Sequence, residues 1–327
     1  MCLSLAERSD ATCIKTSTRY SAKIKNDISY KIIRLLNFLF LYGTFKKDLI
    51  DKLEFDRSTM KIILSRKGFD SANGGIVSPI MEDGTMLSFP IPSKDKDSYD
   101  DLIYCDQPYS RILKDLKYKG GFNCHVDPDL SEDRRKAKID SWCPIFGQIN
   151  SSSTYLMNNV DVKVGDLFLF FGNYHKVRYA DGKYQYIKKT GDFYSDCDLQ
   201  VIWGYMQVGE IITIPEEQRK YSWHPHSSEK RVENITNVMF KASDKLSFNE
   251  NMSGAGLLAF REDRVLTAKN CNKATWKNNP VYDVDSIIGN RKNCSKIPSG
   301  IYYAGIWQEL GLKETLECEE WARSIVL

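Results

Sequence analysis

The longest apolar segments of the chain lie in its middle and have the length and spacing of β-strands. Residues 164–171 begin with a Gly-Asp turn and continue as an unbroken hydrophobic run, which is typical of a strand buried on both faces. Residues 199–212 give a second long strand signal, and the two glycines within it favour a bend or a bulge. Between these segments, the Asp-Gly pair within residues 180–183 predicts a hairpin turn.

Short helices and a further strand are predicted on either side of these strands in the sequence. Residues 61–65 have the composition of a first strand, and apolar residues at helical spacing predict a helix within 109–117. Short helices are also predicted for residues 151–159 and 314–325. The predicted fold class is therefore α+β, with a mixed, mainly antiparallel β core and short peripheral helices.

Residues 1–59 are predicted to be an N-terminal extension, and residues 60–327 to form the domain. The extension contains an apolar run of about fourteen residues, 32–45, which is shorter than the ~20 residues needed to cross a bilayer and includes an arginine. A buried or amphipathic helix is one interpretation of this run. The other is that it lies outside the native domain, since Met60 directly precedes the first strand signal.

The amino-acid composition says little about the function, but it excludes some classes of protein. Hydrophobic residues make up 42% of the chain and charged residues 27%, which is ordinary for a globular protein in solution. The net charge of +3 argues against a non-specific nucleic-acid coat, although it allows a local basic groove. Nine cysteines without a CxxC pair indicate reduced thiols. We therefore expect a cytoplasmic protein without membrane association, disulfides or a four-cysteine zinc site.

Histidine is rare in this chain, and its positions are informative. Three of the four histidines fall in two short polar clusters that lie about a hundred residues apart. In the first cluster, alternation along an extended segment places His125, Asp127 and Asp129 on one side. In the second, a proline disfavours a helix, so His224 and His226 project from a stiff segment. We expect the two clusters to converge in space.

Imidazole plus carboxylate is the ligand set of a divalent metal, and it also performs general acid–base catalysis. The candidate ligands of an iron, zinc or manganese ion are His125, Asp127, His224 and His226. The candidate catalytic residues are Asp70, His125, Asp127 and Asp129. The order His-x-Asp…His resembles the facial triad of non-haem iron oxygenases, in which Arg231 would bind an acidic co-substrate. The alternative is that these side chains only fix a turn around Pro128.

A glycine-rich loop directly after the first strand is a candidate for anion binding. Arg66 and Lys67 lie in this loop together with Asp70, and cations near glycine amides suit a phosphate or a nucleotide backbone. The alternative is a solvated surface loop. The strand at 199–212 also carries Trp203 and Tyr205, which could stack a base. Aromatic residues on strands more often belong to the core.

Several short motifs occur in one order along the chain from residue 60 to the C-terminus. They are residues 65–70, 89–92, 125–130, 146–148, 165–172, 203–205, 224–226 and 308–309. In this order they resemble the third type of the nucleotide modification associated domain family. Members of that family are bacterial and phage proteins whose genes lie beside nucleic-acid modification systems.

The resemblance implies a protein of a nucleic-acid (DNA base) modification or phage-defence system. Its partners would be a nucleic acid or nucleotide substrate and other proteins of the system. Together with the histidine clusters, this favours a metal-assisted enzyme that acts on a nucleotide or base. Two alternatives stay open. One is a non-catalytic, PUA-like reader of modified bases, and the other is a non-haem Fe(II)/2-oxoglutarate-type oxygenase.

A chain shortened to begin at Met60 is expected to fold with unchanged stability and activity, because the first strand signal begins there. Thermal unfolding of the full and the shortened chain would measure this. An insoluble shortened chain would contradict the prediction and would mean that the apolar run at 32–45 packs on the domain.

Overall fold

The computed structural model describes residues 60–289, 294–303 and 308–327. The N-terminal extension and its apolar run lie outside these residues, so the domain boundary at Met60 stays a prediction. Within the described part of the chain, no helix is both long and apolar enough to span a bilayer.

A nine-stranded sheet forms the centre of the described domain. Its main path has the order β18–β1–β8–β10–β11–β7, while β2, β9 and β14 pair with the two longest strands. The pairs β1–β8 and β2–β8 are parallel, and the other pairs are antiparallel. The strands are β1 (Ile62–Arg66), β2 (Ser78–Ile80), β7 (Ile145–Gln148), β8 (Leu167–Ala180), β9 (Lys183–Tyr186), β10 (Leu199–Ile212), β11 (Val238–Ala242), β14 (Ala255–Leu257) and β18 (Glu309–Gly311).

Short helices and small sheets surround this sheet. The small sheets pair β3 (Ile91–Pro92) with β6 (Cys124–His125), β4 (Ile103–Tyr104) with β5 (Gln107–Pro108), β12 (Lys245–Leu246) with β13 (Asn249–Ser253), and β17 (Gly300–Tyr303) with β15 (Thr275–Trp276) and β16 (Cys294–Ile297). The α-helices are α3 (Tyr109–Asp115), α4 (Asn150–Thr154), α5 (Phe193–Asp196), α6 (Pro215–Arg219), α7 (Glu229–Val232) and α8 (Leu316–Val326). A π-helical segment, η2 (Tyr155–Val160), continues α4, and the 3₁₀ turns are η1 (Glu132–Arg134), η3 (Pro225–Ser227), η4 (Glu262–Arg264), η5 (Pro280–Tyr282) and η6 (Val284–Ser286).

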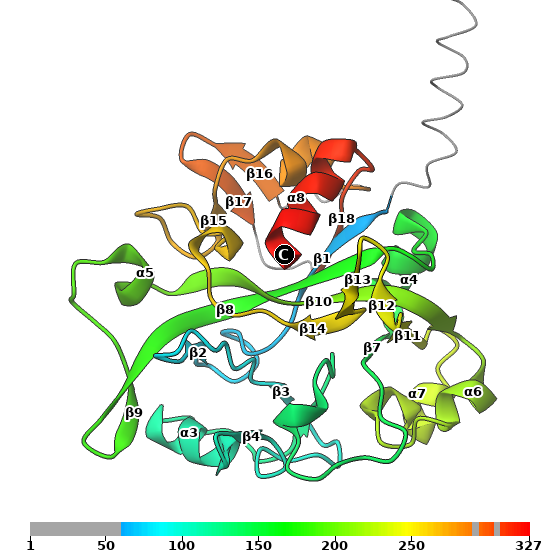
Figure 1. The fold of residues 1–327 in the computed structure, drawn as a ribbon, viewed down its shortest axis with the longest axis horizontal. Coiled ribbons are helices and arrows are strands. Elements are labelled where there is room, and N and C mark those ends of the chain that lie inside the picture. The colour runs from blue at the N-terminus through cyan, green and yellow to red at the C-terminus, as the bar shows by residue number, and fades with distance from the viewer. Residues whose placement is uncertain (1–59, 290–293, 304–307) are drawn as a thin grey trace, which may run out of the picture. The chain divides into compact units, whose positions relative to one another are not determined.

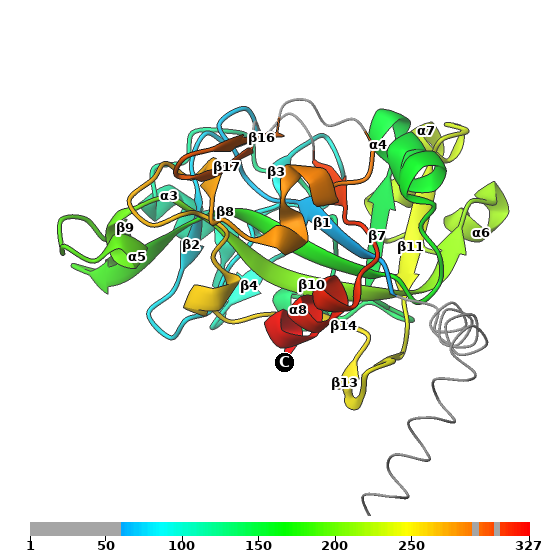
Figure 2. The ribbon, with the colours of Figure 1, turned by 90° about the horizontal axis from the view of Figure 1, so that it is seen from above.

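This architecture confirms the predicted α+β class with a mixed, mainly antiparallel sheet. The long strands β8 and β10 lie side by side across the domain, as Figures 1 and 2 show. In Figure 1, α8 and β15–β17 lie on one side of these strands, and β3, β4 and α3 lie on the other. The sheet thus separates α8 and β15–β17 from the segment that carries the first histidine cluster.

The hydrophobic pattern accounts for the two long strands. The first nine residues of β8 are all buried, as expected for a strand covered on both faces. The predicted hairpin turn is confirmed, because Ala180 pairs with Lys183. Register shifts between Ile202 and Gly204 and between Val208 and Glu210 are the bulges that the two glycines of β10 predicted.

Phenylalanine rings fill the core beneath the strands that carry the site. The ring centroid of Phe146 on β7 lies 5.1 Å from that of Phe168 on β8 and 5.8 Å from that of Phe240 on β11. All three side chains are fully buried. Their packing joins three strands of the sheet, which fixes the backbone of β7 on which the site is built.

Phe168→Ala is expected to lower the free energy of unfolding by about 3–5 kcal/mol, since it removes a fully buried ring and leaves a cavity. Phe122→Ala is the matched control, because that ring is 67% exposed and its loss should change stability little. Chemical denaturation of both variants measures the difference. Equal effects in the two variants would contradict the packing described for β7, β8 and β11.

Candidate metal centre

His125, Asp127 and His226 come together in one place. One ligand atom of each residue lies within 4.8 Å of the ligand atoms of the other two. The Nε2 atoms of His125 and His226 are 3.8 and 3.9 Å from Oδ2 of Asp127. The prediction that the two clusters converge is therefore confirmed, although they lie far apart along the chain.

The backbone of β7 positions the first cluster. Asp129 and Ile145 exchange two backbone hydrogen bonds of 3.0 and 3.2 Å, so the segment after β6 runs along β7. Two residues further on, the amide of Gly147 donates a 2.6 Å hydrogen bond to Oδ1 of Asp127. The carboxylate is thus held by the main chain of a central strand, which limits its movement.

Gly147 also makes room for the second cluster. A Cβ atom at this position would lie 2.3 Å from Cγ of His226, well inside van der Waals contact. The imidazole of His226 therefore packs directly on the backbone of β7. A glycine is required here because of this close approach.

Each of the two imidazoles is fixed through its Nδ1 atom. His125 donates from Nδ1 to Asp95 Oδ2 at 2.8 Å, and Asp95 in turn accepts bonds of 2.6 and 3.0 Å from Arg231. His226 donates from Nδ1 to Asn237 Oδ1 at 2.7 Å. The side-chain amide of Asn237 in turn donates from Nδ2 to Gln218 Oε1. These bonds leave both Nε2 lone pairs directed toward Asp127, as in the outer shell of many histidine metal sites.

The electrostatics of the group favour the protonation states that a metal needs. Burial acts to raise the pKa of Asp127, but its contacts with the imidazoles of His224, His226 and His125 outweigh burial, so this pKa lies well below its usual range. Burial lowers the pKa of His226 to about 3. At neutral pH the cluster therefore holds an ionised carboxylate and a neutral imidazole, which are the forms that bind a cation.

His224 lies on the other side of the same carboxylate. Its Nε2 is 3.3 Å from Oδ1 of Asp127, and its side chain is fully buried. Its Nδ1 accepts a 3.3 Å hydrogen bond from the amide of His226, so the proton of the ring is on Nε2 and faces Asp127. His224 thus contacts Asp127 through Oδ1, whereas His125 and His226 face Oδ2.

Asp129, the last residue of the predicted catalytic set in this cluster, makes a different contact. Its Oδ2 accepts hydrogen bonds of 2.7 Å from Arg135 Nε and 3.0 Å from Trp142 Nε1. Arg135 also lies 3.4 Å from Asp97. Asp129 is therefore the buried partner of an arginine, and the group of three ligand atoms does not include it.

A cavity of about 230 Å³ opens beside His125, Asp127 and His226. Its wall also contains Arg66, the last residue of β1, together with Lys67 and Asp70 of the glycine-rich loop that follows. The loop predicted to bind an anion and the histidine clusters thus line one cavity, which the sequence alone did not establish.

The charged residues of this loop differ in how firmly they are paired. Arg66 Nη1 lies 3.4 Å from Asp70 Oδ2. Asp70 Oδ1 accepts from the amides of Ala72 and Asn73, so this carboxylate fixes the turn of the loop. Lys67 Nζ donates 2.9 Å to Glu309 Oε1 of β18. Arg66 therefore has the loosest pairing of the three.

Trp203 and Tyr205, the residues predicted to stack a base, do not line the 230 Å³ cavity. Trp203 lines a separate cavity of about 50 Å³, which shares Gly68 and Asp127 with the larger one. Tyr205 lines neither cavity and donates a 3.1 Å hydrogen bond to the carbonyl of Ser253. Both side chains are buried, with 3% and 4% of their surface exposed.

Asp95, Asn237 and Gly147 belong to this site and were not singled out from the sequence. Asp95 lies in a charged loop, and Asn237 directly precedes β11. No local pattern marks either residue, because each acquires its role only through a histidine that is distant along the chain. The motif around residues 146–148 was the one available signal, and it indicated the family and not the contact.

The sequence model of the family described as nucleotide modification associated domain 3 matches residues 61–300. The chain belongs to this family. The match includes both histidine clusters and the loop after β1, and it places the protein in a nucleotide modification associated system. Neither the curated proteins nor the solved structures contain a significant match.

Gly147→Ala is expected to displace the imidazole of His226, because the added methyl group would overlap its ring. We expect the free energy of unfolding to fall by about 1–3 kcal/mol, as for other overpacked sites. Gly121→Ala is the control, since a Cβ there meets nothing within 4 Å. Chemical denaturation measures both. A tolerated Gly147→Ala would contradict the close packing of His226 on β7.

Proposed function

We propose that this protein is a metal-dependent enzyme that acts on a nucleotide or base within a nucleotide modification system. The observation that carries the proposal is the group formed by His125, Asp127 and His226 at the edge of a 230 Å³ cavity. Both imidazoles are anchored through Nδ1, so their free Nε2 atoms and one carboxylate oxygen face a common point.

The donor set fits a divalent metal. Two ligand atoms at a tetrahedral angle, each about 2.1 Å from zinc, are about 3.4 Å apart. The distances from Asp127 Oδ2 to the two Nε2 atoms are 3.8 and 3.9 Å, and the three ligand atoms lie within 4.8 Å of one another, so the side chains would close inward when a metal binds. Three protein ligands also leave a position open toward the cavity, as catalytic metal sites do.

Two histidines and one carboxylate suit iron, zinc or manganese, consistent with the ligand types of these ions. Such an ion would supply Lewis-acid chemistry or a bound water of lowered pKa. His224, which faces Oδ1, would keep the other oxygen of Asp127 turned toward the site. Asp95 and Asn237 would hold the imidazoles in the required orientation.

Arg66 is the side chain of the cavity best suited to bind an anionic group of the substrate, because its pairing with Asp70 at 3.4 Å is loose. Arg231 already forms two hydrogen bonds with Asp95, so it offers less to an acidic co-substrate. This weakens the case for the 2-oxoglutarate-type oxygenase. The base-reader alternative has less support as well, because Trp203 and Tyr205 do not line the 230 Å³ cavity.

Metal analysis of the purified protein tests the proposal. We expect about one iron, zinc or manganese ion per chain, and loss of that ion in His125→Ala and in His226→Ala. His175→Gln is the matched control, because His175 bonds to Asp198 and to the carbonyl of Ile187, away from the three ligands. That variant should keep the metal even if its stability falls.

The melting temperature of the metal-free His125→Ala protein should stay close to that of the metal-free parent, since Asp95 keeps its two hydrogen bonds from Arg231 when the imidazole is removed. A parent protein that binds none of the three metals would refute the proposal. Metal-independent binding of a modified oligonucleotide without turnover would instead establish the reader.

A further inference from the structure

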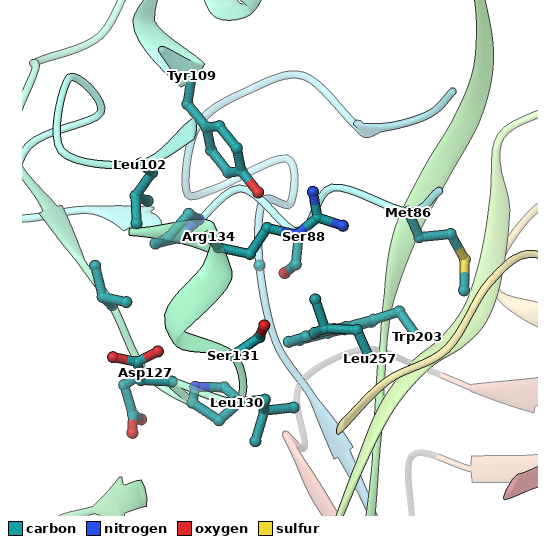
Figure 3. Close-up of a pocket in the computed structure, with 15 residues that line it drawn as sticks. Met86, Ser88, Leu102, Tyr109, Asp127, Leu130, Ser131, Arg134, Trp203 and Leu257 are labelled. Atoms are coloured by element: carbon teal, nitrogen blue, oxygen red, sulfur yellow. The ribbon is translucent and has the colours of Figure 1, made fainter. Parts of the chain in front are cut away.

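The cavity of about 50 Å³ beside the candidate metal centre has a polar wall that the proposed chemistry does not use. Figure 3 shows the guanidinium of Arg134 and the hydroxyl groups of Tyr109 and Ser88 turned toward one another in this cavity. The other side is apolar and includes Trp203 and Leu257. Donors therefore gather at one end of a small hydrophobic space.

Arg134 differs from the other arginines around the site in having no acidic partner. Arg66 lies near Asp70, Arg135 near Asp129, and Arg231 near Asp95. Within the described residues, the side chain of Arg134 forms neither a salt bridge nor a hydrogen bond, and its cationic carbon lies 5.8 Å from the ring centroid of Tyr104. A partly buried guanidinium next to a cavity thus keeps its hydrogen-bond donors available.

The hydroxyl group of Tyr109 is available in the same way. Its residue is 3% exposed, and its side chain forms no hydrogen bond with another described residue. Burial raises the pKa of Tyr109 to about 12, with the charge of Arg134 opposing the rise. Tyr109 is therefore a neutral hydroxyl donor at physiological pH, close enough to Arg134 to sense its charge.

The acidic residues of the cavity do not compete for Arg134. Asp127 lies at the far end in Figure 3 and contacts the histidines and the amide of Gly147. Asp129 is paired with Arg135. The end of the cavity at Arg134 thus has a positive charge that no carboxylate neutralises.

We propose that this cavity is an oxyanion subsite, in which Arg134, Tyr109 and Ser88 bind a phosphate or carboxylate group. Its volume of about 50 Å³ is less than a quarter of that of the 230 Å³ cavity beside the three metal ligands, so the subsite is the smaller of the two spaces. A guanidinium with hydroxyl donors is a favourable partner for such a group.

The assignment of this anion to the substrate rests on the proposed function, whereas anion binding itself does not. The two cavities share Gly68 and Asp127, so a ligand whose reacting part lies at the three metal ligands would have its oxyanion within reach of Arg134. The oxyanion would come from a nucleotide phosphate or from the carboxylate of an acidic co-substrate.

Binding of inorganic phosphate and of succinate to the purified protein tests the proposal, the first by phosphorus NMR and the second by saturation-transfer NMR. We expect at least one of them to bind, and Arg134→Gln to weaken that binding about tenfold or more, the effect of losing a charge-assisted hydrogen bond. Binding of phosphate identifies the first source of the oxyanion, and binding of succinate the second. Arg178→Gln is the control, because Arg178 is an exposed arginine on β8.

The same titration in His226→Ala separates this inference from the proposed function. Arg134-dependent binding that persists in His226→Ala supports the subsite even if the protein proves to hold no metal. Absence of binding by both probes would overturn the inference. Equal binding by the parent and Arg134→Gln would do the same, with the melting temperatures showing that both proteins are folded.

Discussion

The carboxylate of Asp127 is the contact on which the candidate site depends. It accepts a backbone hydrogen bond from Gly147 on β7, faces His125 and His226 with one oxygen, and faces His224 with the other. A buried carboxylate is costly unless such partners offset its desolvation. The two histidine clusters and the central sheet therefore meet at one charged group, and each holds the others in position.

The sheet makes this meeting possible. Because β1 runs parallel to β8 and ends at Arg66, the anion-binding candidates lie at the end of a buried strand and in the loop that follows it. β7 lies at the other end of the sheet order, yet both segments line one cavity. The central strands fix the backbone of the site, and the ligands lie in short segments attached to them: His125 ends the two-residue strand β6, and His226 lies in the 3₁₀ turn η3.

The long strands and the meeting of the histidine clusters were predictable from the sequence, for physical reasons that differ between the two. The hydrophobic runs that form β8 and β10 could be predicted as strands because burial on both faces requires a continuous series of apolar residues. The convergence of His125 and His226 was readable because rare polar residues in stiff, extended segments seldom serve packing. The roles of Asp95 and Asn237 could not be predicted, since each residue orients an imidazole that is distant along the chain. Trp203 and Tyr205 occupy similar positions in the sequence, yet of the two only Trp203 lines one of the two cavities described above.

The ion pair between Lys67 and Glu309 has a consequence for the order in which parts of the site form during synthesis. The two residues are 242 positions apart, and the pair is almost completely buried. Glu309 lies on β18, the edge strand that pairs with β1. During synthesis, the ammonium group of Lys67 has no such partner until residue 309 has been made. The loop beside the candidate metal centre is therefore complete only after β18 has been made and has paired with β1, so the formation of the site depends on a strand made 242 residues later.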